Sequence, residues 1–326
     1  MKLSVVVPAH NEQDNLPELV ERLRGVLAGL PHDWEAILVD DGSTDATWER
    51  MREAASSVAQ VRALRLSRNF GHQAALSAGL SVASGDGVVT MDSDLQHPPE
   101  AIAGLLARAE QGYDVVYAIR REREGEGWFK AGASTAFYRL LNRLARLDLP
   151  EGAADFRYMS RRVVDALIAM PERHRFLRGM TRWVGYRQGV VAYESPARFA
   201  GQSKYTVRHM LRFALNAIVS FSALPLRIAS WLGFVASALG ALYLAYVVVV
   251  RLVTDTVVPG WTSVVVVALI LGGAQLLCLG IIGQYLGQMY DEVKGRPLFL
   301  IADDTRQAGE GKASGPDASS RVTVPG

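Results

Sequence analysis

Val88-Val89-Thr90-Met91-Asp92-Ser93-Asp94-Leu95-Gln96 is the stretch that decides both the fold and the place to look for a site. Its first half is a short apolar run of the kind that forms a buried strand. Two carboxylates one residue apart follow at once, and an amide stands two residues further on. Because a hard divalent cation prefers such oxygen ligands, the stretch predicts a strand that ends in a cation site able to hold a diphosphate. An Asp-rich turn without a cation is the alternative.

Short apolar runs alternate with amphipathic stretches along the first 120 residues. The runs predict strands at 3–7, 35–39, 61–66, 87–91 and 114–119, and the amphipathic stretches predict helices at 14–29, 44–58, 72–83 and 99–110. Further helices are expected at 128–147 and 161–169, and a further strand at 187–194. This alternation predicts an α/β fold whose mainly parallel sheet is covered by helices on both faces.

Polar residues follow each of the first five predicted strands. They are Pro8 to Glu12, Asp40 to Asp45, Ser67 to His72, Asp92 to Gln96, and Arg120 with Arg121. In parallel sheets, ligands bind at the carboxyl ends of the strands, so these residues are candidates for one site. Helix capping is the alternative for Ser43, Thr44 and Asp45.

Composition points to a membrane protein rather than to a nucleic-acid-binding one. The hydrophobic content of 49% and the mean hydropathy of +0.11 are high for a fully soluble enzyme of 326 residues. The net charge is only +2, which gives no reason to expect a nucleic-acid partner. With Cys278 as the single cysteine, no disulfide can form within the chain. The N-terminal apolar run is too short for a secretory signal, so the first domain is expected to stay in the cytosol.

Two long uncharged segments predict a transmembrane hairpin. They lie at about 228–250 and 263–286, and each is long enough to cross the hydrocarbon as a helix. Basic residues flank the hairpin on both sides and only Arg251 lies in its connection, so the positive-inside rule places both ends in the cytosol. A buried helical hairpin of a soluble protein is the alternative. Gly283 and Gly287 form a GxxxG motif, which favours close helix packing, within the hairpin or between copies in a homo-oligomer.

These observations predict four parts. Residues 1–203 form the cytosolic domain, and 204–227 form a basic amphipathic helix on the membrane surface. Residues 228–290 form the hairpin, and 291–326 form a cytosolic tail that is disordered after about 303.

Three motifs, in this order, resemble family 2 glycosyltransferases of the GT-A fold, a Rossmann-like α/β fold. They are Val5-Val6-Val7-Pro8 with Asn11-Glu12, Val39-Asp40-Asp41-Gly42-Ser43-Thr44-Asp45, and Asp92-Ser93-Asp94-Leu95-Gln96. Five further stretches narrow the match: Leu66-Ser67-Arg68-Asn69-Phe70-Gly71, Gln96-His97-Pro98-Pro99-Glu100, Asp155-Phe156-Arg157, Arg198 to Tyr205 and Ile281 to Gly287. With the hairpin they are similar to polyisoprenyl-phosphate glycosyltransferases, a group that includes undecaprenyl-phosphate glucosyl and aminoarabinosyl transferases and dolichyl-phosphate mannose synthases. The resemblance covers about residues 3–300.

The resemblance implies roles for the residues at the matching positions. The nucleotide-sugar site would be Pro8, His10, Glu12, Asp40, Asp41, Asp92 and Ser93, and the Mg²⁺ or Mn²⁺ site would be Asp92, Asp94 and Gln96. The acceptor phosphate would be held by Arg120 or Arg121 together with Arg198 and Lys204, and the catalytic residues would be Asp94, Asp155, Arg198 and Lys204. Asp155 would position the acceptor or act as a base, or it is a structural carboxylate paired with Arg157. Solvated surface charge is the alternative for Arg120 and Arg121.

The implied activity is an inverting, metal-dependent transfer of a sugar from a nucleotide to polyprenyl phosphate, such as undecaprenyl phosphate. It would take place at the cytosolic face of the inner membrane. UDP-glucose is the first expectation for the donor. An aminoarabinose derivative, GlcNAc, galactose or GDP-mannose are the alternatives. A polysaccharide synthase is disfavoured, because the QxxRW motif of those enzymes needs Gln where Gly179 precedes Arg182-Trp183. A non-catalytic scaffold is disfavoured because the three residues of the metal site are all present.

Overall fold

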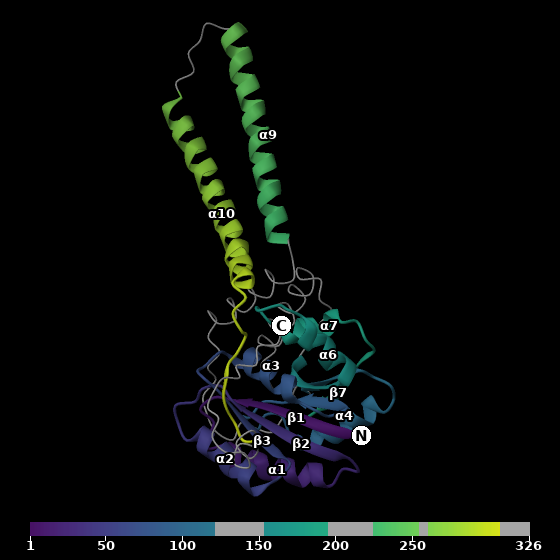
Figure 1. The fold of residues 1–326 in the computed structure, drawn as a ribbon. Coiled ribbons are helices and arrows are strands. Elements are labelled where there is room, and N and C mark those ends of the chain that lie inside the picture. The colour runs from purple at the N-terminus through teal and green to yellow at the C-terminus, as the bar shows by residue number, and fades with distance from the viewer. Residues whose placement is uncertain (121–152, 195–223, 254–259, 307–326) are drawn as a thin grey trace. The chain divides into compact units, whose positions relative to one another are not determined.

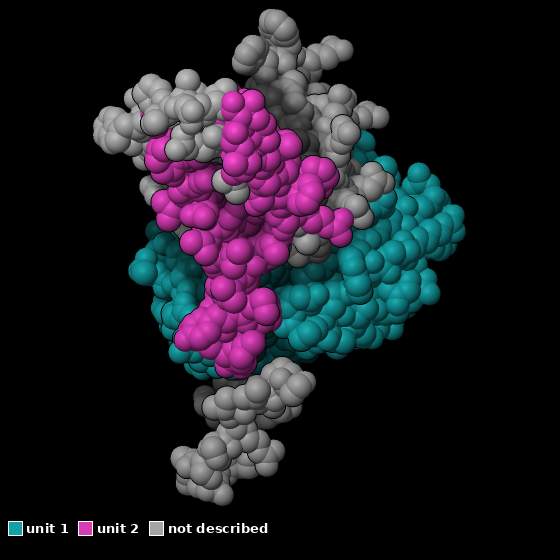
Figure 2. All heavy atoms as spheres, turned by 90° about the horizontal axis from the view of Figure 1, so that it is seen from above, with its two compact units in different colours: residues 1–142, 147–207, 296–326 teal, residues 143–146, 208–295 magenta. Residues whose placement is uncertain are grey.

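The structure is a computed structural model that describes residues 1–120, 153–194, 224–253 and 260–306 (Figure 1). The chain divides into two units, coloured separately in Figure 2. The α/β unit comprises Met1–Asn142, Leu147–Val207 and Arg296–Gly326, and the helical unit comprises Arg143–Arg146 and Arg208–Gly295. The α/β unit is therefore discontinuous in sequence. The predicted helix at 128–147 and most of the predicted amphipathic helix at 204–227 lie outside the described residues.

Eight strands form one sheet in the order β7-β5-β6-β4-β1-β2-β3-β8. Their bounds are β1 Lys2–Ala9, β2 Asp33–Asp40, β3 Val61–Leu66, β4 Gly87–Thr90, β5 Val115–Arg120, β6 Ala153–Ser160, β7 Gln188–Tyr193 and β8 Ile301–Asp304. Six of them run parallel, whereas β6 is antiparallel to β4 and β5, and β8 is antiparallel to β3. The predicted mainly parallel α/β sheet is confirmed.

Helices cover both faces of the sheet, as predicted. They are α1 Leu16–Ala28, α2 Thr47–Ser57, α3 His72–Val82, α4 Ile102–Ala109, α6 Arg161–Ala169 and α7 Leu177–Trp183, with a 3₁₀ turn at Pro99–Ala101 before α4. Val5 and Val7 of β1 share one buried core with α1, α2 and α4. Val6, between them, points to the other face and contacts α3, where a Cβ on Gly79 would lie 2.2 Å from its Cγ1. Burial on both faces explains why β1 is apolar throughout.

The strand β8 belongs to the sheet although it follows the two long helices in sequence. Arg62 of β3 donates from Nε and Nη2 to the two carboxylate oxygens of Asp304, at 3.0 and 2.6 Å. Thr305 adds a reciprocal pair, because its N–H and its Oγ1 both bond to the backbone of Ala63. The order of Asp304 and Thr305 on the sheet extends slightly past residue 303, where the sequence predicted disorder to begin, and residues 307–326 of the predicted tail lie outside the described residues.

The helices α9 Leu224–Val253 and α10 Trp261–Val293 make up the described part of the helical unit. Pro225–Val250 and Val266–Val293 are long and apolar enough to cross a membrane, and none of the residues in their most apolar windows is buried by protein. The alternative of a buried soluble hairpin is therefore wrong for the described residues. A Cβ on Gly283 or Gly287 would meet no atom within 4 Å, so this motif does not mediate close packing inside the hairpin. Packing between copies stays a prediction.

Candidate active site

The loops after β1 and β2 lie next to each other, because Ala9 and Asp40 are register partners at the ends of these parallel strands. Asn11 joins the two loops: its N–H donates to Ser43 Oγ at 3.0 Å, and its Oδ1 accepts from the N–H of Thr44 at 2.9 Å. Asn11 has a φ of 55°, a left-handed conformation that asparagine tolerates better than most residues. Ser43 and Thr44, for which helix capping was the alternative, thus hold the loop after β1 through Asn11.

Asp41 connects the end of β2 to the loop after β3. Its carboxylate accepts from the N–H groups of Phe70 and Gly71 at 2.7 and 2.9 Å. Burial raises the pKa of the Asp41 carboxyl, and these two hydrogen bonds offset only part of that effect. Gly42 follows with a φ of 64°, and a Cβ there would lie 2.4 Å from the carbonyl carbon of Arg68. The Asp-Asp-Gly motif therefore brings two loops together at the predicted site.

The other residues predicted to bind the nucleotide lie around this junction. Asp40 is fully buried, and its Oδ1 accepts from the N–H of Ser43 at 2.9 Å, so its carboxylate shapes the loop. His10 places Nδ1 3.0 Å from the carbonyl oxygen of Asp41, and Glu12 accepts from Asn15 Nδ2 at 2.6 Å. Pro8 lies within β1, and Ser93 is buried. Contact of these residues with a nucleotide stays a prediction.

The acidic turn after β4, residues Asp92 to Gln96, is held by two kinds of contact. The N–H of Asp92 donates to His97 Nδ1 at 2.9 Å, which fixes the start of the turn. Asp94 accepts from the backbone N–H and from Nε2 of Gln96, at 3.1 and 2.9 Å. Leu95 between them has a φ of 61°, an unusual conformation for a branched apolar residue and a sign of local strain. The turn therefore presents Asp92, Asp94 and Gln96 within one short loop.

The donor set of this turn fits a hard divalent cation. The Oδ1 atom of Asp92 is buried and accepts no hydrogen bond from a described residue, and His72 Nε2 lies 3.4 Å from it. A buried carboxylate oxygen without a partner is costly, and a metal ion would remove that cost. The described residues contain no group of three or more His, Cys, Asp or Glu side chains arranged around a metal position. A metal at this turn would thus use two carboxylates, an amide and oxygens of the substrate.

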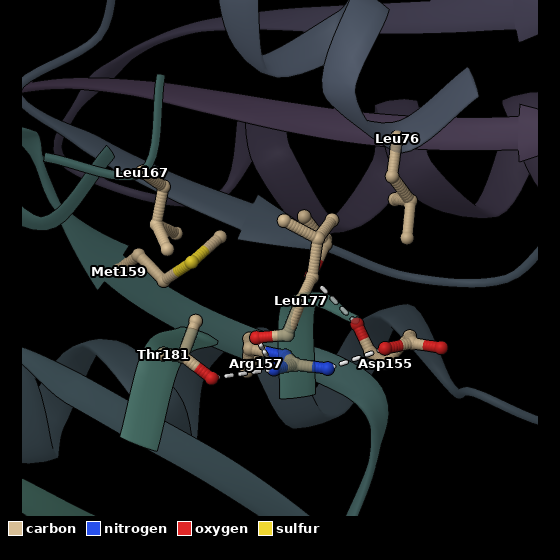
Figure 3. Close-up of a pocket in the computed structure, with 8 residues that line it drawn as sticks. Leu76, Asp155, Arg157, Met159, Leu167, Leu177 and Thr181 are labelled. Atoms are coloured by element: carbon tan, nitrogen blue, oxygen red, sulfur yellow. Dashed lines mark hydrogen bonds and ion pairs between the residues drawn. The ribbon is translucent and has the colours of Figure 1, made fainter. Parts of the chain in front are cut away.

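Asp155, at the start of β6, lies at the centre of a buried ionic network (Figure 3). Its carboxylate accepts from Arg157 Nη2 and, at 3.2 and 2.9 Å, from Nε and Nη2 of Arg178. His72 Nε2 lies 3.4 Å from Asp155 Oδ2 and so stands between Asp155 and Asp92. Burial alone would raise the pKa of the Asp155 carboxyl, but Arg178, His72 and Arg157 outweigh it and hold the pKa well below 3.8.

The same network joins three elements of the fold. Arg157, 1% exposed, also donates to Thr181 Oγ1 at 2.8 Å, and Figure 3 shows its guanidinium between Asp155 and Thr181. Gln73 of α3 accepts from the N–H of Leu177 at 3.0 Å and approaches Asp155 with Nε2 at 3.4 Å. The cavity beside this network is too small to hold a water molecule. The geometry therefore favours the alternative of a structural carboxylate over a base.

Of the four cationic residues predicted to hold the acceptor phosphate, Arg120 alone lies among the residues that the structure describes. This residue ends β5, and its charge acts on the phenol of Tyr193 together with those of Asp92 and Asp94. Arg120 is also the register partner of Tyr193, so its charge and those of the acidic turn act on the same phenol. Arg121, Arg198 and Lys204 lie outside the described residues, and their roles stay predictions.

The rule of strand ends included His72 among the candidates, because Ser67 to His72 follow β3, but it gave His72 no specific role. The sequence did not assign Arg178 or Tyr193 to the site. Arg178 lies on the short helix α7 and Tyr193 inside a predicted strand, and neither carries a local signal.

Comparison with known proteins identifies the family. Residues 4–168 match the model of Glycosyl transferase family 2. The chain belongs to glycosyltransferase family 2. A protein of Synechocystis sp. named as an uncharacterized glycosyltransferase is 44% identical over 303 residues, covering 93% of this chain and 95% of that one. The bactoprenol glucosyl transferase derived from prophage SfII in Shigella flexneri is 39% identical over 306 residues, covering 94% and 99%.

Solved structures of other glycosyltransferases are also similar to this family 2 chain. Glucosyl-3-phosphoglycerate synthase from Mycobacterium tuberculosis, in complex with phosphoglyceric acid, has a TM-score of 0.48 and is 22% identical, covering 68% of this chain and 80% of that one. Mannosyl-3-phosphoglycerate synthase from Rubrobacter xylanophilus has a TM-score of 0.47 and is 20% identical, covering 70% and 74%.

Proposed function

We propose that the chain transfers glucose from UDP-glucose to a polyprenyl phosphate at the cytosolic face of the membrane. The observation that carries the proposal is its similarity to proteins named bactoprenol glucosyl transferase. These are 36–39% identical and match over 92–94% of this chain. A match of this extent includes both apolar helices, so the relatives share the membrane part as well as the catalytic part. Two exposed apolar helices also suit an acceptor that is itself a lipid.

The acidic turn would bind the donor. Asp92 and Asp94, with Gln96, would hold Mg²⁺ or Mn²⁺, which neutralises charge on the departing nucleoside diphosphate as a Lewis acid. The loops held together by Asp41 and Asn11 would bind the nucleotide. Because these loops and the acidic turn follow neighbouring parallel strands, one extended donor can reach both.

The acceptor would not need a general base. A lipid monophosphate has a second pKa of about 6 and is mostly dianionic at neutral pH, so its oxygen is already a nucleophile. That oxygen attacks C1 of the sugar, the bond from C1 to the diphosphate oxygen breaks, the nucleoside diphosphate leaves with the electron pair, and the configuration at C1 inverts. Asp155, bonded to two arginines, would position His72 and Arg178 at the edge of the site rather than accept a proton.

The position of β8 supports a cytosolic location for both ends of the hairpin. The helices α9 and α10 separate β7 from β8 in sequence, yet both strands belong to one hydrogen-bonded sheet. Strands of one sheet lie on the same side of a bilayer, which supports a hairpin that returns the chain to the side from which it started. Positive charges at Arg227, Lys294 and Arg296, outside the hairpin, favour the cytosol as that side.

The test is a donor screen with the purified full-length protein in detergent. Labelled UDP-glucose, UDP-galactose, UDP-GlcNAc and GDP-mannose are each incubated with Mn²⁺ and undecaprenyl phosphate, and labelled lipid is measured. We expect product from UDP-glucose. Asp94→Asn should abolish transfer and keep the melting temperature, whereas Asp165→Asn, at an exposed position on α6, should keep full activity. Product from a different donor would correct the sugar, and no product from any donor would refute the proposal.

A further inference from the structure

The ring of Tyr193 is fixed beside the acidic turn. Tyr193 is the last residue of β7 and is 8% exposed. Its ring meets those of Phe156 and His97 edge to face, with centroids 5.6 and 6.2 Å away, and those two rings stack at 5.1 Å. Because His97 Nδ1 accepts from the N–H of Asp92, Tyr193 packs directly against the side chain that holds the turn.

The hydroxyl of Tyr193 makes no hydrogen bond to any described residue, although the residue is more than nine-tenths buried. The charges of Arg120, Asp92 and Asp94 all act on this phenol, and Arg120 is its register partner on the neighbouring parallel strand β5. A phenol with the ordinary pKa of about 10 is neutral at pH 7.5, so the hydroxyl can donate a hydrogen bond.

We propose that the Tyr193 hydroxyl donates a hydrogen bond to a phosphate oxygen of a substrate bound between the acidic turn and Arg120. The inference rests on the proposed function, since that function supplies the phosphates. A lysine at this place would pair with Asp92 or Asp94 and compete with a metal ion for their oxygens. A neutral phenol can bind an anionic oxygen and leave both carboxylates to the metal. The phosphate belongs either to the nucleotide donor or to the lipid acceptor.

Tyr193→Phe tests the inference, because it keeps the ring contacts and removes only the hydroxyl. Transfer is measured with the donor varied at saturating acceptor and with the acceptor varied at saturating donor. We expect kcat/KM to fall about 10- to 100-fold, the loss for one hydrogen bond to a charged group, with an unchanged melting temperature. A loss confined to the donor series assigns the bond to the diphosphate, and a loss confined to the acceptor series assigns it to the lipid phosphate.

Tyr158→Phe is the matched control. Tyr158 is 5% exposed on β6 of the same sheet, but its hydroxyl lies beside Gly87 at the opposite end of β4. This variant should transfer sugar at the wild-type rate. If Tyr193→Phe stays within about twofold of wild type in both series, the inference is wrong, since a bond to a charged group is worth more than that.

Failure of the proposed function gives a different result. If the wild-type protein transfers no sugar, the affinities of UDP-glucose with Mn²⁺ and of undecaprenyl phosphate are compared for wild type and Tyr193→Phe. A weaker affinity for either ligand in the variant would support the inference without the proposed activity. Equal affinities for both ligands would overturn it.

Discussion

Asp155→Asn should unfold the α/β unit at a lower temperature as well as reduce transfer. The substitution removes the charge that faces Arg157 and Arg178, whose side chains are 2% and 23% exposed. Breaking a buried ion pair from one side costs about 3–5 kcal/mol, because the remaining charge stays buried without compensation. We expect the lower end, about 3 kcal/mol, since the amide oxygen of Asn can still accept one bond. For a unit of this size that corresponds to a melting temperature lower by roughly 6–12 °C.

The melting temperature is measured by intrinsic fluorescence in detergent at pH 7.5, and Asp94→Asn is the matched control. Asp94 lies in the acidic turn, and an Asn there can still accept the bond from the backbone of Gln96, so its melting temperature should stay within about 2 °C of wild type. If Asp155→Asn melts like wild type but loses transfer, Asp155 has a chemical role and the structural role proposed for it is wrong.

The pH dependence of the Asp155 contribution follows from the direction of its pKa shift. The folded pKa lies well below 3.8, the ordinary value that the group has in the unfolded chain. The unfolded state therefore takes up a proton first as the pH falls. The stabilisation is present in full above about pH 5, and it is lost below pH 4 as the pH falls towards the folded pKa. The difference in melting temperature between wild type and Asp155→Asn should thus be largest at about pH 5 to 6, because, against the effect of burial, Asp155 also raises the pKa of His72 and that contribution is lost as the pH rises through the raised value.

Two further predictions concern the metal and the last strand. Incubation with EDTA should abolish transfer, and Mn²⁺ or Mg²⁺ should restore it, because the proposed metal would offset charge on the leaving diphosphate. Transfer that persists after exhaustive chelation would exclude this role. Asp304→Asn should lower the melting temperature by roughly 6–12 °C, because Arg62, with a side chain 13% exposed, loses its bidentate partner. The control Glu21→Gln removes one side of an exposed ion pair and should change the melting temperature by less than about 2 °C. Equal melting temperatures for these two variants would show that β8 does not stabilise the sheet.

The periodicity of the sequence was enough to predict most of the parallel sheet. Strands such as β1 are apolar because helices cover both faces, and the following helices show one apolar side, so the two patterns are easy to separate. The polar residues that follow these strands also allowed the acidic turn and Asp41 to be predicted as parts of the site. A parallel strand always presents its carboxyl end at the same edge, and that edge was the place to look for a site.

The strands β6 and β8 were missed for different physical reasons. In β6, Asp155 and Arg157 stand two residues apart on one face and neutralise each other, so charged residues occupy positions that periodicity expects to be apolar. The strand β8 is only four residues long and is held by the Arg62–Asp304 pair rather than by an apolar pattern. Partners so far apart in sequence cannot be matched without the fold.

Antiparallel pairing also explains why Asp155 enters the site from an unexpected direction. Thr90, the last residue of β4, is the register partner of Arg157, so β6 starts at the edge where β4 ends. A residue near the start of an antiparallel strand thus reaches the same edge as residues that follow parallel strands. The sequence reached Asp155 only through its resemblance to the family, and the resemblance left its role open between a base and a structural carboxylate. Two arginines on one carboxylate favour the structural role, and they suit an acceptor that is ionised before it enters the site, because such an acceptor needs cations and neutral donors around it rather than a base.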